Sequence, residues 1–223
     1  MEVDTYGEFD RFDWPPNEKG FSRMVQRIDI SIGRVRDQLQ ELGIDDNTIV
    51  MFSSDNGPHH EGGHKVTRFN SSGGFQGYKR SLHEGGIRIP FIAHWPSVIE
   101  PGQTSDLMAY FPDLMATFCE LAGAHPPETT DGISFAPFLR GQQQVKHEYL
   151  YCEYVGQLAV RKSNFKLCQS EDGEEALYDL VADRHEDNDI KEQLPDVFDE
   201  LKTYVVGEYA DYRATDVPGR QVY

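Results

Sequence analysis

Residues 48–57 read TIVMFSSDNG, and this stretch decides the fold class. Its apolar run, Ile49 to Phe52, is rich in β-branched side chains and is typical of a strand covered on both faces. The run leads into Asp55 and Asn56, and open α/β sheets place their ligands beyond the carboxyl ends of their strands. A carboxylate and an amide oxygen offer two hard ligands to a cation such as calcium. Asp-Asn-Gly is also common turn chemistry, so an ordinary turn is the alternative.

The residues on either side of this strand predict further elements of an α/β domain. From Phe21 to Leu42 apolar residues recur at steps of three and four, which predicts an amphipathic helix directly before the strand. Residues 87–95 predict a second buried strand, which begins at Pro90. Pro112 is a suitable first residue for a third element, a helix with its own apolar face.

The C-terminal part of the chain has a different pattern. After residue 145, short aromatic-rich runs separated by turn residues predict an antiparallel meander, with one face on a helix over 194–209. We therefore expect an α/β fold with a partial mixed sheet flanked by helices, followed by a small C-terminal antiparallel sheet with a helix. The predicted division is residues 1–144 for the first part and 145–223 for the second.

Composition excludes several classes of protein. A net charge of −17 argues against nucleic acid as a partner. No run approaches the roughly 18 apolar residues of a membrane span, so no membrane partner is expected. The acidic first residues lack an apolar stretch, so we expect no signal peptide there. The three cysteines have no paired spacing and predict small buried side chains.

A glycine-rich, basic loop follows the Asp55-Asn56 pair. Residues 57–86 contain eight glycines, and long loops in compact domains are usually functional. Between His59 and Arg88, five lysines and arginines outnumber two glutamates. This charge suits an anionic ligand held beside a metal, although an ordinary solvated loop is the alternative.

His60 to His64 match H-E-x-x-H, the zinc-protease signature. That chemistry needs both histidines on one face of a helix. Two adjacent glycines inside the motif would cost about 2 kcal/mol of helix propensity. We therefore interpret the match as a coincidence.

Five stretches, in order, carry a resemblance to a known family. They are SSDNGP (53–58), GYKRSLHEGGIRIPFIAHWP (77–96), DGISFAPFLRG (131–141), AVRKSNFKLCQ (159–169) and ALYDLVADRHEDN (176–188). Together they resemble the C-terminal half of the type I, formylglycine-dependent sulfatases of the alkaline-phosphatase-like superfamily. The second stretch is the most specific, because it fixes Lys, Glu, two Gly, Arg and Pro within 14 positions.

The resemblance implies roles for three residues. Asp55 and Asn56 look like two ligands of the active-site calcium, with magnesium as the alternative metal. Lys79 looks like the catalytic lysine that contacts the substrate sulfate and steadies charge on the ester oxygen. A compact lysine ammonium is a suitable donor for the oxygens of a sulfate ester.

Other residues near these positions have less specific roles. Glu84 to Gly86 and Arg88 are expected to hold the loop in shape, since paired glycines allow close approach of the backbone. His59, His60 and His83 are candidates for substrate binding, although a loop histidine is more often only solvated.

The family's nucleophile is absent from this chain. No cysteine or serine lies in the C/S-x-P-x-R motif that is oxidised to formylglycine, so formylglycine is expected in a missing N-terminal half. We therefore expect the C-terminal fragment of a sulfuric ester hydrolase of the arylsulfatase type, active at full length and inactive alone. The truncated chain should self-associate through unpaired strand edges.

The resemblance also sets expectations for substrate and location. The substrate would be a sulfated small molecule or glycan, and sulfatases are periplasmic, secreted or lysosomal. One alternative is a phosphodiesterase-type or phosphonate-type relative. The resemblance argues against it, because phosphate-cleaving relatives have an Asp-His pair, which suits zinc, where this chain has Asp55 and Asn56. The other is a non-catalytic module that binds sulfated glycans, which the charge of −17 disfavours.

Overall fold

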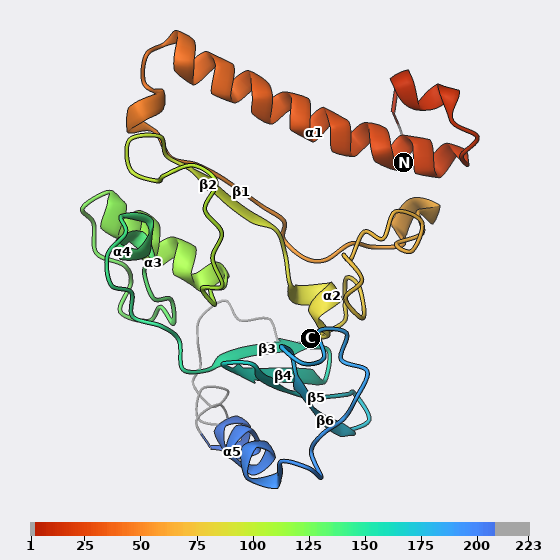
Figure 1. Cartoon of the computed structure of the whole chain (residues 1–223), viewed down its shortest axis with the longest axis vertical. Coiled ribbons are helices and arrows are strands. Elements are labelled where there is room, and N and C mark those ends of the chain that lie inside the picture. Colours follow the sequence, from red (N-terminus) through yellow and green to blue (C-terminus); the bar gives the residue numbers. More distant parts are fainter. Residues whose placement is uncertain (1–2, 208–223) are drawn as a thin grey trace. The chain divides into compact units, whose positions relative to one another are not determined.

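The computed structural model describes residues 3–207 (Figure 1). Contacts between residues divide the chain into two units. The first unit comprises Met1–Ser71 and Ile89–Val145, and the second comprises Ser72–Arg88 and Lys146–Tyr223. Residues 72–88 thus group with the C-terminal part of the chain by their contacts. The division at residue 144 stays a prediction about domains. The fold class is α/β, with a small antiparallel sheet and a helix at the C-terminal end, as predicted.

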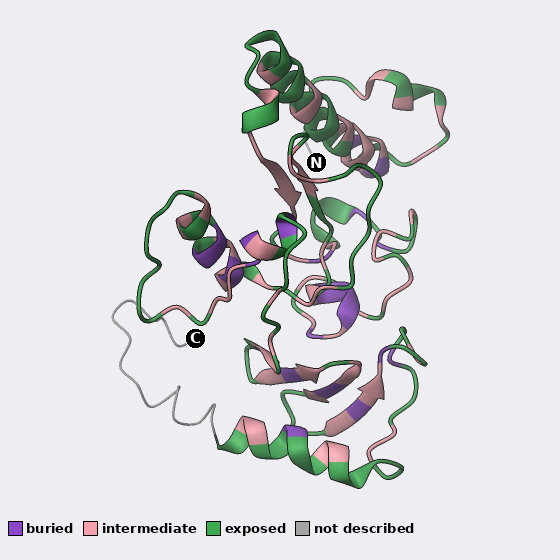
Figure 2. Cartoon of the chain, turned by 60° about the vertical axis from the view of Figure 1, so that its left-hand side comes forward, coloured by how far each residue is buried: buried purple, intermediate pink, exposed green. Residues whose placement is uncertain are grey.

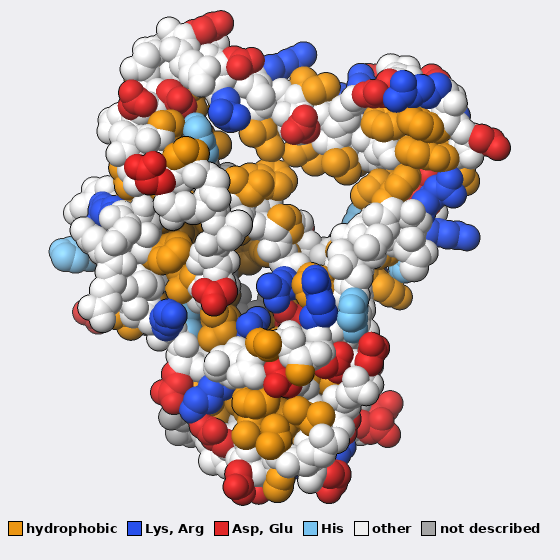
Figure 3. All heavy atoms as spheres, viewed as in Figure 1, with side chains coloured by type: hydrophobic (Ala, Val, Ile, Leu, Met, Phe, Trp, Pro, Cys, Tyr) orange, Lys and Arg blue, Asp and Glu red, His pale blue; other side chains and the backbone are white. Residues whose placement is uncertain are grey.

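The first unit begins with η1 (Gly7–Arg11), the long helix α1 (Pro16–Glu41) and η2 (Asp45–Asn47). The predicted helix is present and starts before Phe21, because a proline is favourable in the first turn. Figure 2 shows that α1 is mostly exposed or half-buried, and Figure 3 shows hydrophobic side chains along its surface. The exposed apolar side chains of this helix are Met24, Val25, Ile28, Ile30 and Val35. Within residues 3–207, no helix combines the length and the apolar composition that a membrane crossing requires.

Strand β1 (Val50–Ser53) pairs antiparallel with β2 (Phe91–His94), with Val50 opposite His94. The prediction that β1 is covered on both faces is wrong for this chain. All four residues of β1 are half-buried, and Phe91 and Ile92 of β2 are exposed, because a sheet of two strands leaves much of their surface accessible.

Helix α3 (Phe111–Leu121) contains Pro112 in its first turn, as predicted, and is followed by α4 (Ala136–Leu139). The buried carboxylate of Asp113 accepts the backbone N–H groups of Tyr110 at 3.0 Å and Ile133 at 2.8 Å. One side chain thereby caps the helix and attaches the segment that leads to α4.

The second unit contains the predicted antiparallel meander. Its strands are hydrogen-bonded in chain order, and the helix that follows packs against them (Figure 1). Tyr209, at the end of the predicted helix, lies outside the described residues. The elements are α2 (Glu84–Ile87), β3 (Leu150–Tyr154), β4 (Gln157–Lys162), β5 (Phe165–Gln169), β6 (Glu175–Asp179) and α5 (Pro195–Val206).

The two faces of this meander differ in character. Val160, Leu167 and Leu177 lie side by side on one face and form a buried core with Leu201 of α5. Because side chains alternate along a strand, Lys166 lies on the opposite face. It is nevertheless only 1% exposed, so the second face is covered too.

Replacing Leu201 by alanine should lower the free energy of unfolding of the second unit by about 2–5 kcal/mol, because the side chain is fully buried in this core. Urea denaturation of the chain, followed by circular dichroism, measures the change. The matched control is Val206→Ala in the same helix, where the side chain is 66% exposed and the expected change is within about 0.5 kcal/mol. Equal losses for the two variants would contradict the assigned core.

Candidate functional site

The predicted metal-binding pair lies directly beyond the carboxyl end of β1. Asp55 is exposed and Asn56 is half-buried, and the Ser54 hydroxyl donates to the backbone carbonyl of Asn56 at 2.9 Å, which closes the turn. Among residues 3–207, no group hydrogen-bonds to the Asp55 carboxylate or to the side-chain amide of Asn56. These two oxygen donors therefore fit a hard cation, of whose roughly 6–8 ligands they would supply two.

The neighbouring histidines make local contacts in the same unit. The Nδ1 atom of His59 accepts the backbone N–H of Glu61 at 2.9 Å and lies 3.9 Å from its carboxylate. The Nδ1 atom of His60 lies 3.2 Å from the carbonyl oxygen of His64. Their role in substrate binding stays a prediction.

The H-E-x-x-H match is not a helical zinc motif. Its centre, η3 (Glu61–Gly63), is a single turn in which Gly62 has a φ of 68°. His64 is buried, and its Nδ1 lies 2.7 Å from a carboxylate oxygen of Glu18. Its ring stacks on Phe21 with 3.7 Å between the ring centroids. His64 is thus part of the packing that attaches this loop to α1.

The predicted sulfate-binding lysine lies on a folded loop of the second unit. Lys79 is half-buried, and the next residue, Arg80, has a φ of 78°, an uncommon conformation for a side chain with a Cβ. The Gly85 N–H donates to the carbonyl of Gln76 at 2.7 Å, which closes the loop at its base. The Gln157 side chain of β4 donates to the carbonyl of Arg80 at 3.2 Å.

The paired glycines at the end of this loop allow the close approach that the sequence predicts. A Cβ atom on Gly85 would lie 2.3 Å from the carbonyl oxygen of Gly77, and one on Gly86 would lie 2.0 Å from that of Ser81. Both glycines are buried in α2, which is purple in Figure 2. A side chain at either position would force the loop open.

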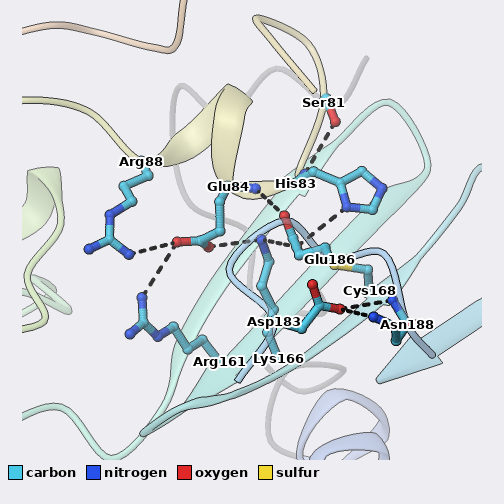
Figure 4. Close-up of polar contacts among 10 residues, drawn as sticks. All are labelled: Ser81, His83, Glu84, Arg88, Arg161, Lys166, Cys168, Asp183, Glu186 and Asn188. Atoms are coloured by element: carbon cyan, nitrogen blue, oxygen red, sulfur yellow. Dashed lines mark hydrogen bonds and ion pairs between the residues drawn. The ribbon is translucent and has the colours of Figure 1, made fainter. Parts of the chain in front are cut away.

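A buried charge cluster joins α2 to the meander (Figure 4). The ammonium of Lys166 lies 3.0 Å from Oε1 of Glu84 and 2.9 Å from Oε1 of Glu186. The backbone N–H of Glu84 also donates to Glu186 at 2.6 Å. The guanidinium groups of Arg88 and Arg161 lie 3.2 and 3.8 Å from the other oxygen of Glu84. Three segments distant in sequence are therefore tied together by ionic contacts.

The surroundings favour the charged forms of Lys166 and Glu186. Burial alone would lower the pKa of Lys166, but Cys168, Glu84 and Glu186 outweigh burial and raise it above its ordinary value. Burial would raise the pKa of Glu186, but His83, Lys166 and the Glu84 N–H outweigh burial and lower it. Lys166 and Glu186 therefore form an ion pair at the centre of this network.

The same carboxylate has two further neighbours. The Nδ1 of His83 lies 3.4 Å from Oε1 of Glu186, and the sulfur of Cys168 lies 4.0 Å from the same atom. This imidazole, thiol and carboxylate are close enough to ligate a metal. The Lys166 ammonium, however, already provides the positive charge there, and burial raises the pKa of Cys168 to about 12. Of the three groups, the Glu186 carboxylate is the one that pairs with Lys166 in the ion pair network.

The predicted site residues fall in both units. Asp55, Asn56, His59 and His60 belong to the first, whereas Lys79 and His83 belong to the second, together with residues 72–88. A joint site formed by the two sets stays a prediction.

Sequence reasoning missed the role of Lys166 and Glu186. The only signal was a lysine within an otherwise apolar strand, and the alternation of β5 suggests a solvated face for it. That the loop around Glu84 covers this face cannot be read from the spacing, because the segments are far apart in the chain.

Comparison with known proteins assigns the family. The family model for sulfatases matches residues 9–124, which is more than half of the chain. The model for the C-terminal region of N-sulphoglucosamine sulphohydrolase matches residues 73–209. The two matches overlap on the loop that carries Lys79.

Individual relatives agree with this assignment. An N-acetylgalactosamine-6-O-sulfatase from Bacteroides thetaiotaomicron is 30% identical over an alignment of 202 residues, and the match covers 80% of this chain and 39% of that protein. A solved structure in complex with k-i-k-neocarrahexaose has a TM-score of 0.75 and 25% sequence identity to this chain. The match covers 90% of this chain and 44% of the chain in that structure.

A further solved structure, in complex with its substrate D-glucosamine-2-N,6-O-disulfate, has a TM-score of 0.72 and 25% identity. The match covers 91% of this chain and 42% of that chain. The chain thus spans less than half the length of these relatives. With two family models each matching more than half of its residues, the chain belongs to the sulfatase family.

Proposed function

We propose that this chain is the C-terminal portion of a sulfuric ester hydrolase. In this role Asp55 and Asn56 hold a divalent cation, and Lys79 binds the sulfate of the substrate. The observation that carries the proposal is the pair of oxygen donors beyond β1, which no described residue engages, in a chain of the sulfatase family.

The chemistry of these residues suits a sulfate ester. A bound Ca²⁺ ion, or Mg²⁺ as the alternative, would offset the negative charge of the sulfate oxygens. The Lys79 ammonium donates hydrogen bonds to those oxygens and stabilises the charge that develops on the ester oxygen as the S–O bond breaks. The closed base of its loop, from Gln76 to Gly85, limits the positions that Lys79 samples.

We propose a sulfated saccharide as the substrate class. Two structural neighbours support this choice, since their ligands are k-i-k-neocarrahexaose and D-glucosamine-2-N,6-O-disulfate. His59, His60 and His83 are the proposed contacts to the saccharide, because imidazole nitrogens both donate to and accept from hydroxyl groups. A sulfated small molecule is the competing substrate.

The catalytic nucleophile is proposed to lie in a part of the protein outside these residues. The chain has no C/S-x-P-x-R motif for formylglycine and spans less than half of its relatives. The exposed apolar side chains of α1 also support a larger folded unit, in which they would be covered. A periplasmic, secreted or lysosomal location is proposed together with this function.

The full-length protein, with the formylglycine motif, should hydrolyse sulfated mono- and disaccharides. Lys79→Ala should lower kcat/KM by about 100- to 1000-fold, because one preorganised donor to the developing charge is lost. Ion chromatography of released sulfate measures the rate, and the 223-residue chain alone should release none. The control is Lys65→Ala, an exposed lysine of the first unit, which should leave the rate unchanged.

Preference for phosphate monoesters over the matched sulfate esters would overturn this proposal in favour of a phosphohydrolase. Faster turnover of aryl or steroid sulfates than of sulfated saccharides would support the proposed sulfate ester hydrolysis but contradict the proposed substrate class. Release of sulfate by the 223-residue chain would refute the proposed fragment.

Calcium should bind the chain alone only weakly, with a dissociation constant of about 1 mM, because two side-chain ligands are far fewer than the roughly 6–8 that calcium takes. Isothermal titration calorimetry measures this affinity. Asp55→Ala should abolish the binding, whereas Asp46→Ala, at another exposed carboxylate of the same unit, should not. Micromolar affinity would show that the proposed site is complete within the chain.

The chain alone should form concentration-dependent dimers or larger species, since the two-stranded sheet has edges that no strand within residues 3–207 pairs with, beside exposed apolar side chains. Size-exclusion chromatography with light scattering measures the mass. Ile92→Lys on β2 should shift the population toward monomer, whereas Val181→Lys, at a residue 82% exposed in the other unit, should not. A wild-type monomer at all concentrations would contradict this expectation.

A further inference from the structure

We propose that Lys166 is a positioning residue for the sulfate-binding lysine. With Glu84 and Glu186 it forms a buried lock that fixes the loop presenting Lys79. This role presupposes the proposed function of Lys79 and extends it, since it makes the C-terminal meander responsible for the geometry of sulfate binding.

The lock acts at a single point of the Lys79 loop. Glu84 follows Lys79 by five residues and is where the loop enters α2. Its side chain is attached to β5 through Lys166 at 3.0 Å, and its backbone N–H is attached to the segment after β6 through Glu186 at 2.6 Å. An attachment through side chain and backbone together fixes the direction of the chain as well as its position.

The backbone contacts of the loop couple the position of Glu84 to the position of Lys79. Its base is closed by the hydrogen bond between the Gly85 N–H and the Gln76 carbonyl, and Gly85 and Gly86 lie against the carbonyls of Gly77 and Ser81. The backbone on either side of Lys79 therefore packs directly on the residues next to Glu84. Movement of Glu84 moves the loop as one piece.

The lock is rigid because its three side chains are shielded from water. The side chains of Lys166, Glu84 and Glu186 are 1%, 3% and 0% exposed, so water does not compete for their contacts. Two adjacent carboxylates repel each other in such surroundings, and the ammonium is the buried cation that contacts both of them. Removing Lys166 should therefore displace Glu84 rather than leave it in place.

A double-mutant cycle in the full-length protein tests this role. Lys166→Met should lower kcat/KM for a sulfated saccharide by about 10- to 100-fold, the usual effect of losing a residue that orients a functional group. In a Lys79→Ala background the same substitution should lower kcat/KM by less than about 3-fold, because there is no lysine left to position. A residue that only stabilises the fold would give the same factor in both backgrounds.

Two further variants make the test robust. Glu84→Gln keeps the shape of the side chain and the contact between Lys166 and Glu186, so it loosens the lock with less risk to folding, and should show the same coupling to Lys79. Leu201→Ala destabilises the opposite face of the same sheet and should change kcat/KM by less than about 3-fold at a temperature where the protein is folded.

The outcomes separate this role from the function it presupposes. If Lys79→Ala leaves kcat/KM unchanged, the proposed function fails. If Lys79→Ala is impaired while Lys166→Met and Glu84→Gln are not, or if their effects add to that of Lys79→Ala, the positioning role is wrong and the function stands.

Discussion

The second unit depends on one buried ammonium group placed between two carboxylates. Burial of a single charge is costly, and the contacts of Lys166 with Glu84 and Glu186 become favourable only when all three groups come together. Arg88 and Arg161 then complete the neutralisation of Glu84 from the partly exposed side. These charges force α2, β5 and the segment after β6 to assemble with one another, which apolar packing alone would not specify.

The two faces of the meander are consequently both covered, but by contacts of different kinds. On one face, Val160, Leu167 and Leu177 pack against α5, and the stabilisation is apolar and tolerant of small shifts. On the other face the contacts are ionic and directional, and they hold the short helix α2 and the loop that leads into it. The loop that bears Lys79 therefore belongs structurally to the C-terminal unit, although it lies between β1 and β2 in the chain.

The first unit contributes a different kind of constraint. Strand β1 leads into a tight turn at Asp55 and Asn56, whose side-chain oxygens accept no hydrogen bond from residues 3–207. The charged residues that do lie buried in this unit, such as Glu18 and Asp113, serve local attachment of loops to helices. The proposed metal ligand, Asp55, and the fold-stabilising carboxylates are thus separate groups, distinguished by whether a described protein donor already hydrogen-bonds to them.

The sequence by itself determined the helices, the meander and the family. Period and turn chemistry are local properties, so α1, α3 and the four strands of the meander follow from neighbouring residues, and the motif from Gly77 to Pro90 identifies sulfatases. The burial of Lys166, its two carboxylate partners and the grouping of residues 72–88 with the C-terminal unit were decided only by tertiary structure. Their cause is a balance of desolvation and charge pairing among separate segments, with Glu84 lying 82 residues from Lys166 in the chain, which no local pattern records.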